Sequence, residues 1–372
     1  MNPRQFTSIA KTTAAFSVAC LAHFAVPSAS AATFYWDSTS PFSSSGFGNA
    51  AGTWAQNSTS GSGRWVTNSA GTVAGSGVQN TSGSDIFNFG TTANGLGEGT
   101  INVNGAVTMG NTNYASSSGS ITLSGGTINY RSAVAVTVNN DANTIGSVIG
   151  GAATSFTKAG TGTLTLEAAN SYTGTTIINN GTLALGASGS INSSSGVTLG
   201  GGTFDVSAKV GGYEISNLSG SGTVTGALTV STQLSIGTTP GSSGFNSLTL
   251  AASSNYQLGL DGGGTDAGLG NVSGTLDLGG AVLDLVQLGT YTVDDKFTLF
   301  GYQAGTLAGT FAGLTNGDTF SDAGGMWQID YDDATPGLNG GTGTSFVTIT
   351  AVPEPSAALL GALGLLALLR RR

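Results

Sequence analysis

Oxygen-bearing side chains cluster near the C-terminal end of the chain, at Asp330, Asp332, Asp333 and Asn339. Calcium takes about six to eight oxygen ligands, and a loop of this kind could supply roughly three or four of them. The segment has neither an EF-hand pattern nor a nonapeptide calcium repeat. A solvated acidic turn is therefore the favoured interpretation. We predict no metal and no other cofactor, with the three aspartates as the only calcium candidates.

Basic and acidic side chains could also act together in catalysis. Polysaccharide lyases of the parallel β-helix type combine an Arg or Lys base with carboxylates on one outer face, and glycosidases need two carboxyl groups about 5 to 9.5 Å apart. Arg64, Arg131 and Lys158 have no Asp or Glu within five residues. We therefore expect no enzymatic activity. A polysaccharide lyase or hydrolase is the alternative, and it requires residues 64, 131, 158 and 209 to gather on one face.

Residues 1–31 have the pattern of a secretory signal peptide. Arg4 and Lys11 form a positive start, an apolar stretch follows, and Ala29-Ser30-Ala31 is a small-x-small cleavage site. Cleavage is expected after Ala31, within one residue. The only cysteine and the only histidine lie in this segment. The mature protein would therefore lack disulfides, thiolate or imidazole metal ligands, a cysteine nucleophile and a histidine base.

The mature region carries few charges, and most of them are negative. From Ala32 to Leu369 it contains five Lys or Arg against nineteen Asp or Glu, and five minus nineteen gives a net charge of −14. Such a chain repels nucleic acids and anionic lipid surfaces. Nucleic acid is therefore excluded as a partner.

Short β-strands with a common sequence pattern recur along the chain. The clearest are Gly-Thr-Leu-Thr-Leu at 162–166 and Gly-Thr-Leu-Ala-Leu at 181–185. Similar strands occur at 99–103, 119–123, 196–199, 247–250 and 274–278. A period near twenty residues, with Gly or Asn turns between the strands, is typical of a β-solenoid. We predict an all-β protein in which residues 32–290 form a parallel β-helix, with short helices only in the signal peptide and in a C-terminal membrane segment.

The alternation within each strand predicts which side chains face the interior. The predicted inward set is Leu164, Leu166, Leu183 and Leu185, with Thr165 and Ala184 outside. Rows of outward threonines, such as Thr163, Thr165, Thr175 and Thr176, could order ice-like water. Their spacing along the sequence is irregular, which argues against that function.

The segment 157–186 has a more specific pattern. It contains Thr157-Lys158-Ala159-Gly160, then Asn170-Ser171-Tyr172-Thr173-Gly174, then Asn180-Gly181-Thr182-Leu183. This segment resembles the autotransporter-associated β-strand repeat, which is found in passenger domains with right-handed parallel β-helix folds. A true autotransporter ends in a translocator barrel, and fewer than two hundred residues follow Gly186. We therefore expect a different export route.

Aromatic residues gather at both ends of the predicted solenoid. Residues 291–350 contain longer, aromatic-rich strands, and we predict that they form an antiparallel β cap that shields the last coil. Tyr35, Trp36, Trp54 and Trp65 at the other end could stack on sugar rings. The favoured interpretation is that they cap the first coil.

The last twenty-one residues, 352–372, have three parts: Val352-Pro353-Glu354-Pro355, an apolar run that ends at Leu369, and Arg370-Arg371-Arg372. The run from Ala357 would span about 20 Å as a helix, less than the roughly 30 Å bilayer core. The arginines would stay in the cytoplasm by the positive-inside rule. This arrangement resembles the PEP-CTERM sorting signal of Gram-negative bacteria. The resemblance implies an exosortase-like membrane enzyme as partner, cleavage near the Pro-Glu-Pro motif, and a transient or stable membrane anchor.

Together these features predict an exported structural or adhesive protein without catalysis of its own. Its expected location is the cell surface or the extracellular polysaccharide matrix. Exopolysaccharide is therefore a further candidate partner.

Overall fold

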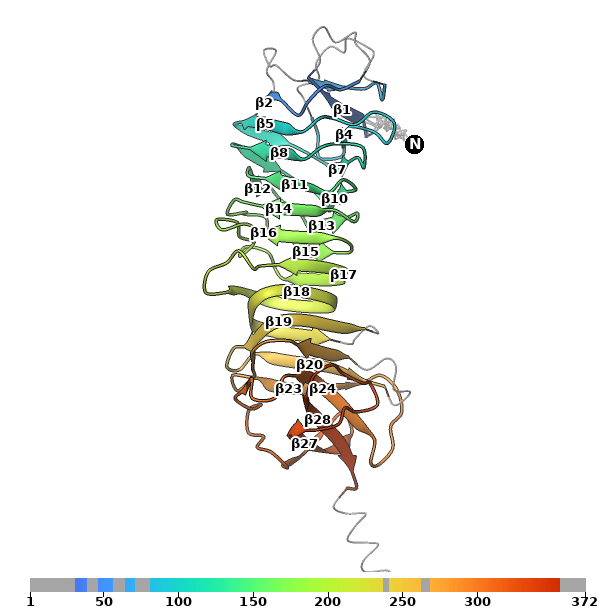
Figure 1. Cartoon of the computed structure of the whole chain (residues 1–372), viewed down its shortest axis with the longest axis vertical. Helices are drawn as coiled ribbons and strands as arrows, with labels where there is room; N and C mark the ends of the chain where they lie inside the picture. Colours follow the sequence, from blue (N-terminus) through green and yellow to red (C-terminus); the bar gives the residue numbers. More distant parts are fainter. Residues whose placement is uncertain are drawn as a thin grey trace, which may run out of the picture. The chain divides into compact units, whose positions relative to one another are not determined.

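The computed structural model describes residues 31–38, 46–55, 64–70, 81–236, 241–261 and 268–354. The chain consists of two compact units, Met1–Ala31 and Ala32–Arg372, each with most of its residue contacts within itself. The regular secondary structure of the described residues is entirely β, and most strand pairs are parallel, which confirms the predicted all-β solenoid (Figure 1). The two expected terminal helices lie outside the described residues.

The alternation of apolar and small polar residues gives each strand an inner and an outer face. In β14 (Thr163–Leu166) and β16 (Thr182–Leu185) the four leucines are buried, whereas Thr165 and Ala184 are partly exposed. The two strands pair in parallel, with Leu164 opposite Leu183 and Leu166 opposite Leu185. The leucines therefore stack from coil to coil, as predicted.

Corresponding strands of successive coils form parallel ladders. The first ladder contains β1 (Thr33–Asp37), β4 (Ile86–Phe89), β7 (Asn111–Tyr114), β10 (Val134–Val138), β13 (Ser155–Ala159) and β15 (Thr175–Ile178). The second contains β2 (Gly52–Ala55), β5 (Gly99–Asn104), β8 (Ile121–Ser124), β11 (Ala142–Ile145), β14 and β16. The third contains β6 (Ala106–Thr108), β9 (Thr127–Asn129) and β12 (Val148–Gly150). β17 (Val197–Asp205) then joins both of the first two ladders.

Tight corners connect the ladders within a coil. Gly181, between β15 and β16, has a φ of +61°, a backbone conformation that favours glycine. A Cβ atom there would lie 2.4 Å from the carbonyl oxygen of Gly162 in the preceding coil. Glycine is therefore required at this corner both for the turn and for the close approach of the two coils.

Later coils are built from longer strands. β18 (Tyr213–Ile236) pairs with β17, then with β19 (Ser242–Leu250) and β20 (Asn255–Leu260). The parallel pairs that follow join β19 to β21 (Leu269–Val272) and β22 (Leu276–Asp277), β20 to β23 (Val282–Gln287), β21 to β24 (Lys296–Tyr302), and β22 to β25 (Leu307–Ala308).

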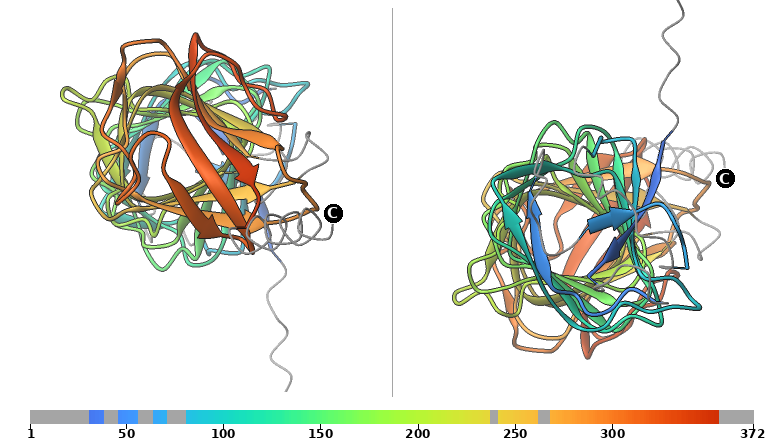
Figure 2. Two further views of the ribbon diagram at one scale, coloured as in Figure 1. Left: turned by 90° about the horizontal axis from the view of Figure 1, so that it is seen from below. Right: turned by 90° about the horizontal axis from the view of Figure 1, so that it is seen from above.

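Antiparallel strands close the C-terminal end of the stack. β24 pairs in parallel with β21 and antiparallel with β28 (Ser345–Val352), which pairs with β27 (Gly325–Asp333) and through it with β26 (Thr319–Asp322). These strands lie across the end of the stack when it is viewed along its axis (Figure 2). Buried Trp327 packs against the rings of Tyr291 and Phe297. The predicted antiparallel cap is confirmed, and β24 belongs to both the solenoid and the cap.

The first coil has an aromatic core. Trp36, Trp54 and Trp65 are fully buried, and Trp65, on β3 (Arg64–Val66), meets each of the other two edge-on at 5.2 Å between ring centroids. These three indoles cannot stack on sugars, so that interpretation is wrong for them because their rings fill the core. β3 pairs antiparallel with β1, consistent with an N-terminal cap.

We predict that Leu164→Ala lowers the free energy of unfolding by about 2 to 5 kcal/mol, because it leaves a cavity in the leucine stack. Chemical denaturation checks this result. Thr165→Ala, on the outer face of the same strand, is the matched control and should cost much less. Equal losses in the two variants would contradict the inward assignment of Leu164.

Candidate functional sites

The predicted sorting motif begins at the end of β28, the last described strand. Val352 is the last residue of β28 and lies opposite Met326 of β27. Pro353 and Glu354 follow as exposed residues without regular structure. Pro355 and the apolar and arginine segments lie outside the described residues, and the described part of the chain contains no helix long and apolar enough to span a bilayer. A protease could therefore reach Pro353 and Glu354 without unfolding β28.

The predicted signal-cleavage site lies at the start of the folded unit. Ala29 is outside the described residues, and Ala31 is exposed. The backbone N–H of Ala32 donates to Asp85 Oδ1 at 3.0 Å, and its carbonyl accepts from Ile86 N–H at 2.8 Å. Asp85 is itself buried. The chain is thus held in the first coil from Ala32 onward, immediately after the expected cleavage site.

Asp333, one of the calcium candidates, is held by a cation of the protein. Its Oδ2 forms an ion pair with Lys296 Nζ at 2.8 Å, and its oxygens also accept hydrogen bonds from Thr335 and Thr348. Burial would by itself raise the pKa of Asp333, but the hydrogen bonds, that of Lys296 foremost, outweigh burial and lower the pKa to about 2. The arrangement fastens β24 to β27 and β28.

The other members of the acidic cluster have separate contacts. Asp330 Oδ1 accepts a hydrogen bond from Asp332 N–H at 3.0 Å. The Asn339 amide donates to the carbonyls of Gly268 and Thr298. Within the described ranges no three Asp, Glu, His or Cys side chains are grouped so as to hold a metal ion. The structure therefore gives these residues a role in holding the cap together.

The basic residues considered for a lyase cannot all lie on one outer face, because Lys158 is buried. Arg64 lies in β3, and Arg131 is exposed after β9. Lys209 is partly exposed between β17 and β18, where its Nζ donates to the Ala187 carbonyl. Lys158 points into the core from β13 and is fully buried. Its side chain cannot meet a polysaccharide, so it cannot serve as a lyase base.

The ammonium group of Lys158 instead binds the backbone of two coils. Its three protons are matched by the carbonyl oxygens of Ala159, Gly160 and Asn180 at 2.9, 2.8 and 3.1 Å. Burial away from water lowers the pKa of Lys158 to about 8. The alternation with buried Phe156 on the same strand is the sequence signal that places Lys158 inside.

Asn170 performs a similar task at another corner of the same coil. Its Oδ1 accepts from Ile149 N–H at 2.8 Å, and its Nδ2 donates to the carbonyls of Ala168 and Ser190 at 3.0 Å each. One side chain thus satisfies backbone groups of three successive turns of the stack. Buried amides are costly unless they are paired in this way.

Thr176 was expected to face outward, and that expectation is wrong. It is fully buried, because it shares the inner face of β15 with Ile178. Its hydroxyl contacts Tyr172 Oη at 2.8 Å and Ser194 Oγ at 3.0 Å, which links two coils through hydroxyl groups. Burial raises the pKa of Tyr172.

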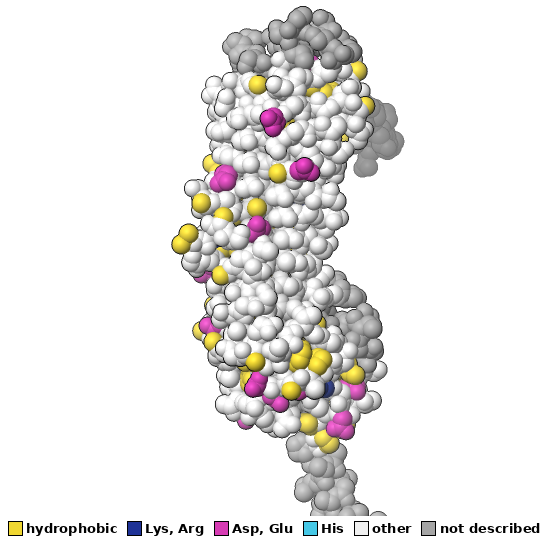
Figure 3. Space-filling view, in the orientation of Figure 1, with side chains coloured by type: hydrophobic (Ala, Val, Ile, Leu, Met, Phe, Trp, Pro, Cys, Tyr) yellow, Lys and Arg dark blue, Asp and Glu magenta, His cyan; other side chains and the backbone are white. Residues whose placement is uncertain are grey.

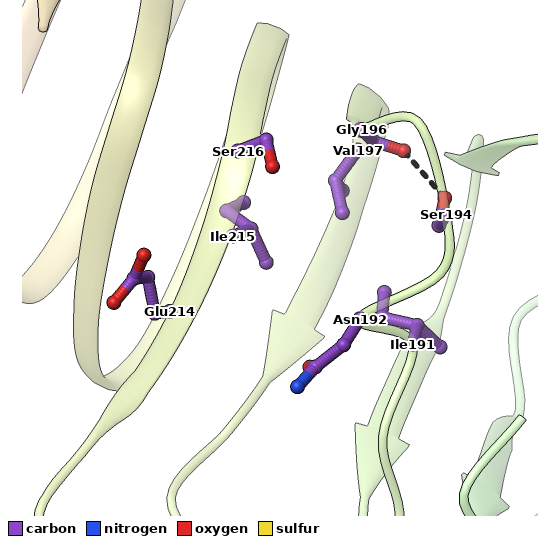
Figure 4. A pocket seen from close by; sticks show the side chains of 8 residues that line it. All are labelled: Ile191, Asn192, Ser194, Gly196, Val197, Glu214, Ile215 and Ser216. Carbon is purple, nitrogen blue, oxygen red and sulfur yellow. Dashed lines mark hydrogen bonds between the residues drawn. The ribbon is translucent and has the colours of Figure 1, made fainter.

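A cleft of about 290 Å³ opens between β18 and the loop that precedes β17 (Figure 4). Ile191, Val197 and Ile215 supply apolar side chains, and Asn192, Ser194, Glu214 and Ser216 supply polar ones. Glu214 is the only carboxylate in this lining, whereas glycoside hydrolysis usually needs a pair. The cleft therefore lacks the acid–base pair of a glycosidase.

Comparison with known proteins identifies one segment. A family model for the passenger-associated-transport-repeat matches residues 156–185, which agrees with the resemblance expected for 157–186. No curated protein and no solved structure matches the chain. The matched segment begins at Phe156 in β13 and ends with β16, so it contains Lys158, Asn170 and Thr176. These three polar residues of the matched segment are buried, and Lys158 and Asn170 satisfy backbone groups of neighbouring coils.

We predict that the free energy of unfolding rises by about 1 to 2 kcal/mol between pH 8 and 9.5 because of Lys158. Its pKa is about 8 in the folded protein and ordinarily 10.5. In this window the unfolded chain holds a proton that the folded chain has released, so stability increases with pH. Denaturant titrations at several pH values measure the slope.

Lys158→Met should remove this rise, and Lys209→Met, which deletes an exposed ammonium group, should retain it. All other titratable groups are the same in wild type and in the two variants, so their contribution to the pH dependence cancels in the comparison. A rise of the same size in Lys158→Met would contradict the assignment to Lys158.

Proposed function

We propose that this protein is exported by a Gram-negative bacterium and acts as a structural or adhesive protein at the cell surface or in the extracellular polysaccharide matrix. The observation that carries the proposal is the matched passenger repeat, which forms β13 to β16 of a parallel β-solenoid. A repeat of this family on this fold fits a secreted passenger-type protein. Coils that bury both apolar stacks and satisfied polar groups suit a durable extracellular scaffold.

The two ends of the chain support the route of export. Residues 1–31 would be removed as a signal peptide, and an exosortase-like membrane enzyme would recognise residues 352–372 and cut near Pro353. Before that step the C-terminal segment would hold the protein at the membrane. The exposure of Pro353 and Glu354 next to β28 suits such cleavage.

We propose that the protein acts by binding and not by catalysis. The separation of the candidate bases and the single carboxylate in the cleft at Glu214 support this view. A polysaccharide lyase or hydrolase gains no support from a specific contact among the described residues.

Intact-mass measurement of the protein taken from its native cell surface tests the route. We expect a chain that begins at Ala32 and ends near Pro353. A mass that includes Arg372 would refute sorting by cleavage, and recovery of the protein only from the cytoplasm would refute export.

A second prediction concerns the new N-terminus. Cleavage after Ala31 would turn the Ala32 nitrogen, 3.0 Å from Asp85 Oδ1, into a charged amino group facing a carboxylate. Charge-assisted hydrogen bonds of this kind contribute about 1.5 to 3 kcal/mol. Acetylation of the mature N-terminus, which removes its charge, should therefore lower the free energy of unfolding by an amount in this range.

In Asp85→Asn the effect of acetylation should largely vanish, whereas in Glu98→Gln, which alters an exposed acid of a nearby coil, it should persist. Wild type and Asp85→Asn, each with and without the acetyl group, form a double-mutant cycle, and thermal and denaturant unfolding of these four proteins measures it. Equal acetylation effects in Asp85→Asn and wild type would show that the pair does not form.

A further inference from the structure

Threonines on the outer face of the second ladder form a continuous line along the stack. Each member lies opposite the next across a parallel strand pair, except at β14, where the line moves sideways from Thr165 to Thr163 on the same strand. All are exposed or partly exposed. The threonine line consists of Thr100, Thr122, Thr144, Thr165, Thr163, Thr182, Thr203 and Thr223.

The sequence does not reveal this alignment. The step from one opposed threonine to the next varies from 19 residues between Thr163 and Thr182 to 22 between Thr100 and Thr122. The loops absorb these differences, and the strands remain in register. Threonines that lie opposite each other on paired strands are therefore one strand spacing apart, about 4.8 Å.

The hydroxyl groups of the threonine line make no hydrogen bond to another protein group among the described residues. Two outward threonines elsewhere do have hydroxyl partners: Thr175 pairs with Ser195 and Thr198 with Ser219, at 3.0 Å each. Each hydroxyl of the line can both donate and accept. Because threonine is β-branched, its hydroxyl is held in few orientations.

Strand propensity alone does not explain the line. The matching outward positions of the first ladder hold a mixture that includes Asn111, Ala135 and Ile177. From β5 to β16 the outward positions of the second ladder carry no charged and no aromatic side chain, and the first charge beside the line is Asp205, next to Thr203 on β17. Asp and Glu side chains are separate from one another along the upper part of the face shown in Figure 3. The line therefore suits an uncharged partner.

The arrangement of the threonines in a single file distinguishes between two uncharged partners, an ice surface and a linear polymer. An ice surface repeats in two dimensions and would need threonines at both outward positions of each strand. β11 has Ala142 beside Thr144, and β16 has Ala184 beside Thr182, so one position is filled on each. A single file of hydroxyls fits a linear polymer that lies along the stack.

We propose that the threonine line binds a linear, uncharged, hydroxyl-bearing polysaccharide. This inference rests on the proposed extracellular location and adds to it the class of ligand and the face that takes it. Sugar hydroxyls would exchange hydrogen bonds with the threonine hydroxyls, and sugar C–H groups would contact the threonine methyl groups. Each contact is weak, so binding depends on many contacts made by one chain.

Affinity electrophoresis of the purified mature protein in gels that contain dextran or hydroxyethyl cellulose tests this proposal. We expect retardation by at least one of these neutral polymers, none by dextran sulfate or carboxymethyl cellulose, and no competition from isomaltotriose or cellotriose. The double variant Thr144→Val and Thr182→Val keeps the shape of the side chains and removes two hydroxyls. Its affinity should fall about tenfold or more.

The control variant carries Thr137→Val and Thr157→Val, at outward positions of the first ladder, and should bind like wild type. Failure to bind either neutral polymer, or equal loss in both double variants, would overturn the proposal. The wild-type protein could instead inhibit ice recrystallisation. If the double variant Thr144→Val and Thr182→Val abolished that inhibition and the control variant did not, the line would be assigned to ice. Intact-mass analysis shows separately whether each variant has been exported and processed. A protein that is exported but does not bind polysaccharide would therefore contradict the binding proposal alone and leave the proposed location unaffected.

Discussion

Parallel register between successive coils is the constraint on which the rest of this structure depends. A coil has an apolar inner face that it cannot cover by itself, and burial is achieved only when the next coil places its own leucines opposite. The opposition of Leu164 to Leu183 and of Leu166 to Leu185 is one example. Backbone hydrogen bonds of the ladders and side-chain stacks in the core enforce the same alignment, so a slip would break both.

Register also explains why polar residues can lie inside the stack. Corners leave backbone carbonyls and N–H groups that no strand partner reaches, and buried polar groups of this kind are costly when unpaired. Lys158 and Asn170 meet this need with side chains that reach into the neighbouring coil. Their hydrogen bonds have the right length only when the coils are aligned. The matched repeat therefore combines residues that build a coil with residues that attach it to its neighbours.

A stack held from within leaves its outer face free for function. The inner positions are restricted to side chains that pack or pair, whereas outward positions tolerate many small polar residues. Edges are protected at both ends: β3 covers β1, and β28 covers β24. The proposed binding on the outer face and the proposed processing near Pro353 and Ala31 would therefore leave the core undisturbed.

Much of the architecture could be predicted from the sequence, because it depends on local alternation and on a period near twenty residues. The all-β class, the inward leucines, the passenger repeat and the antiparallel cap were predicted in this way. Local patterns failed where a polar side chain occupied an inner position. Thr176 was expected outside with the other threonines, and the lyase alternative required Lys158 on the outer face. Lys158 instead shares the inner face of β13 with Phe156, and Thr176 shares that of β15 with Ile178.

The remaining features depended on contacts between residues far apart in the sequence. The acidic cluster was interpreted as a solvated turn, with calcium as the weaker alternative. The ion pair of Lys296 with Asp333 was not predicted, because it forms only where β24 and β27 both pair with β28. The threonine spacing looked irregular, and only the register of the strands aligns the residues. By itself, therefore, the sequence determined the coil and the cap, since these depend on neighbouring residues, whereas the two terminal signals stay predictions. Tertiary structure decided which polar groups meet, because loops of unequal length hide the alignment that backbone hydrogen bonds impose.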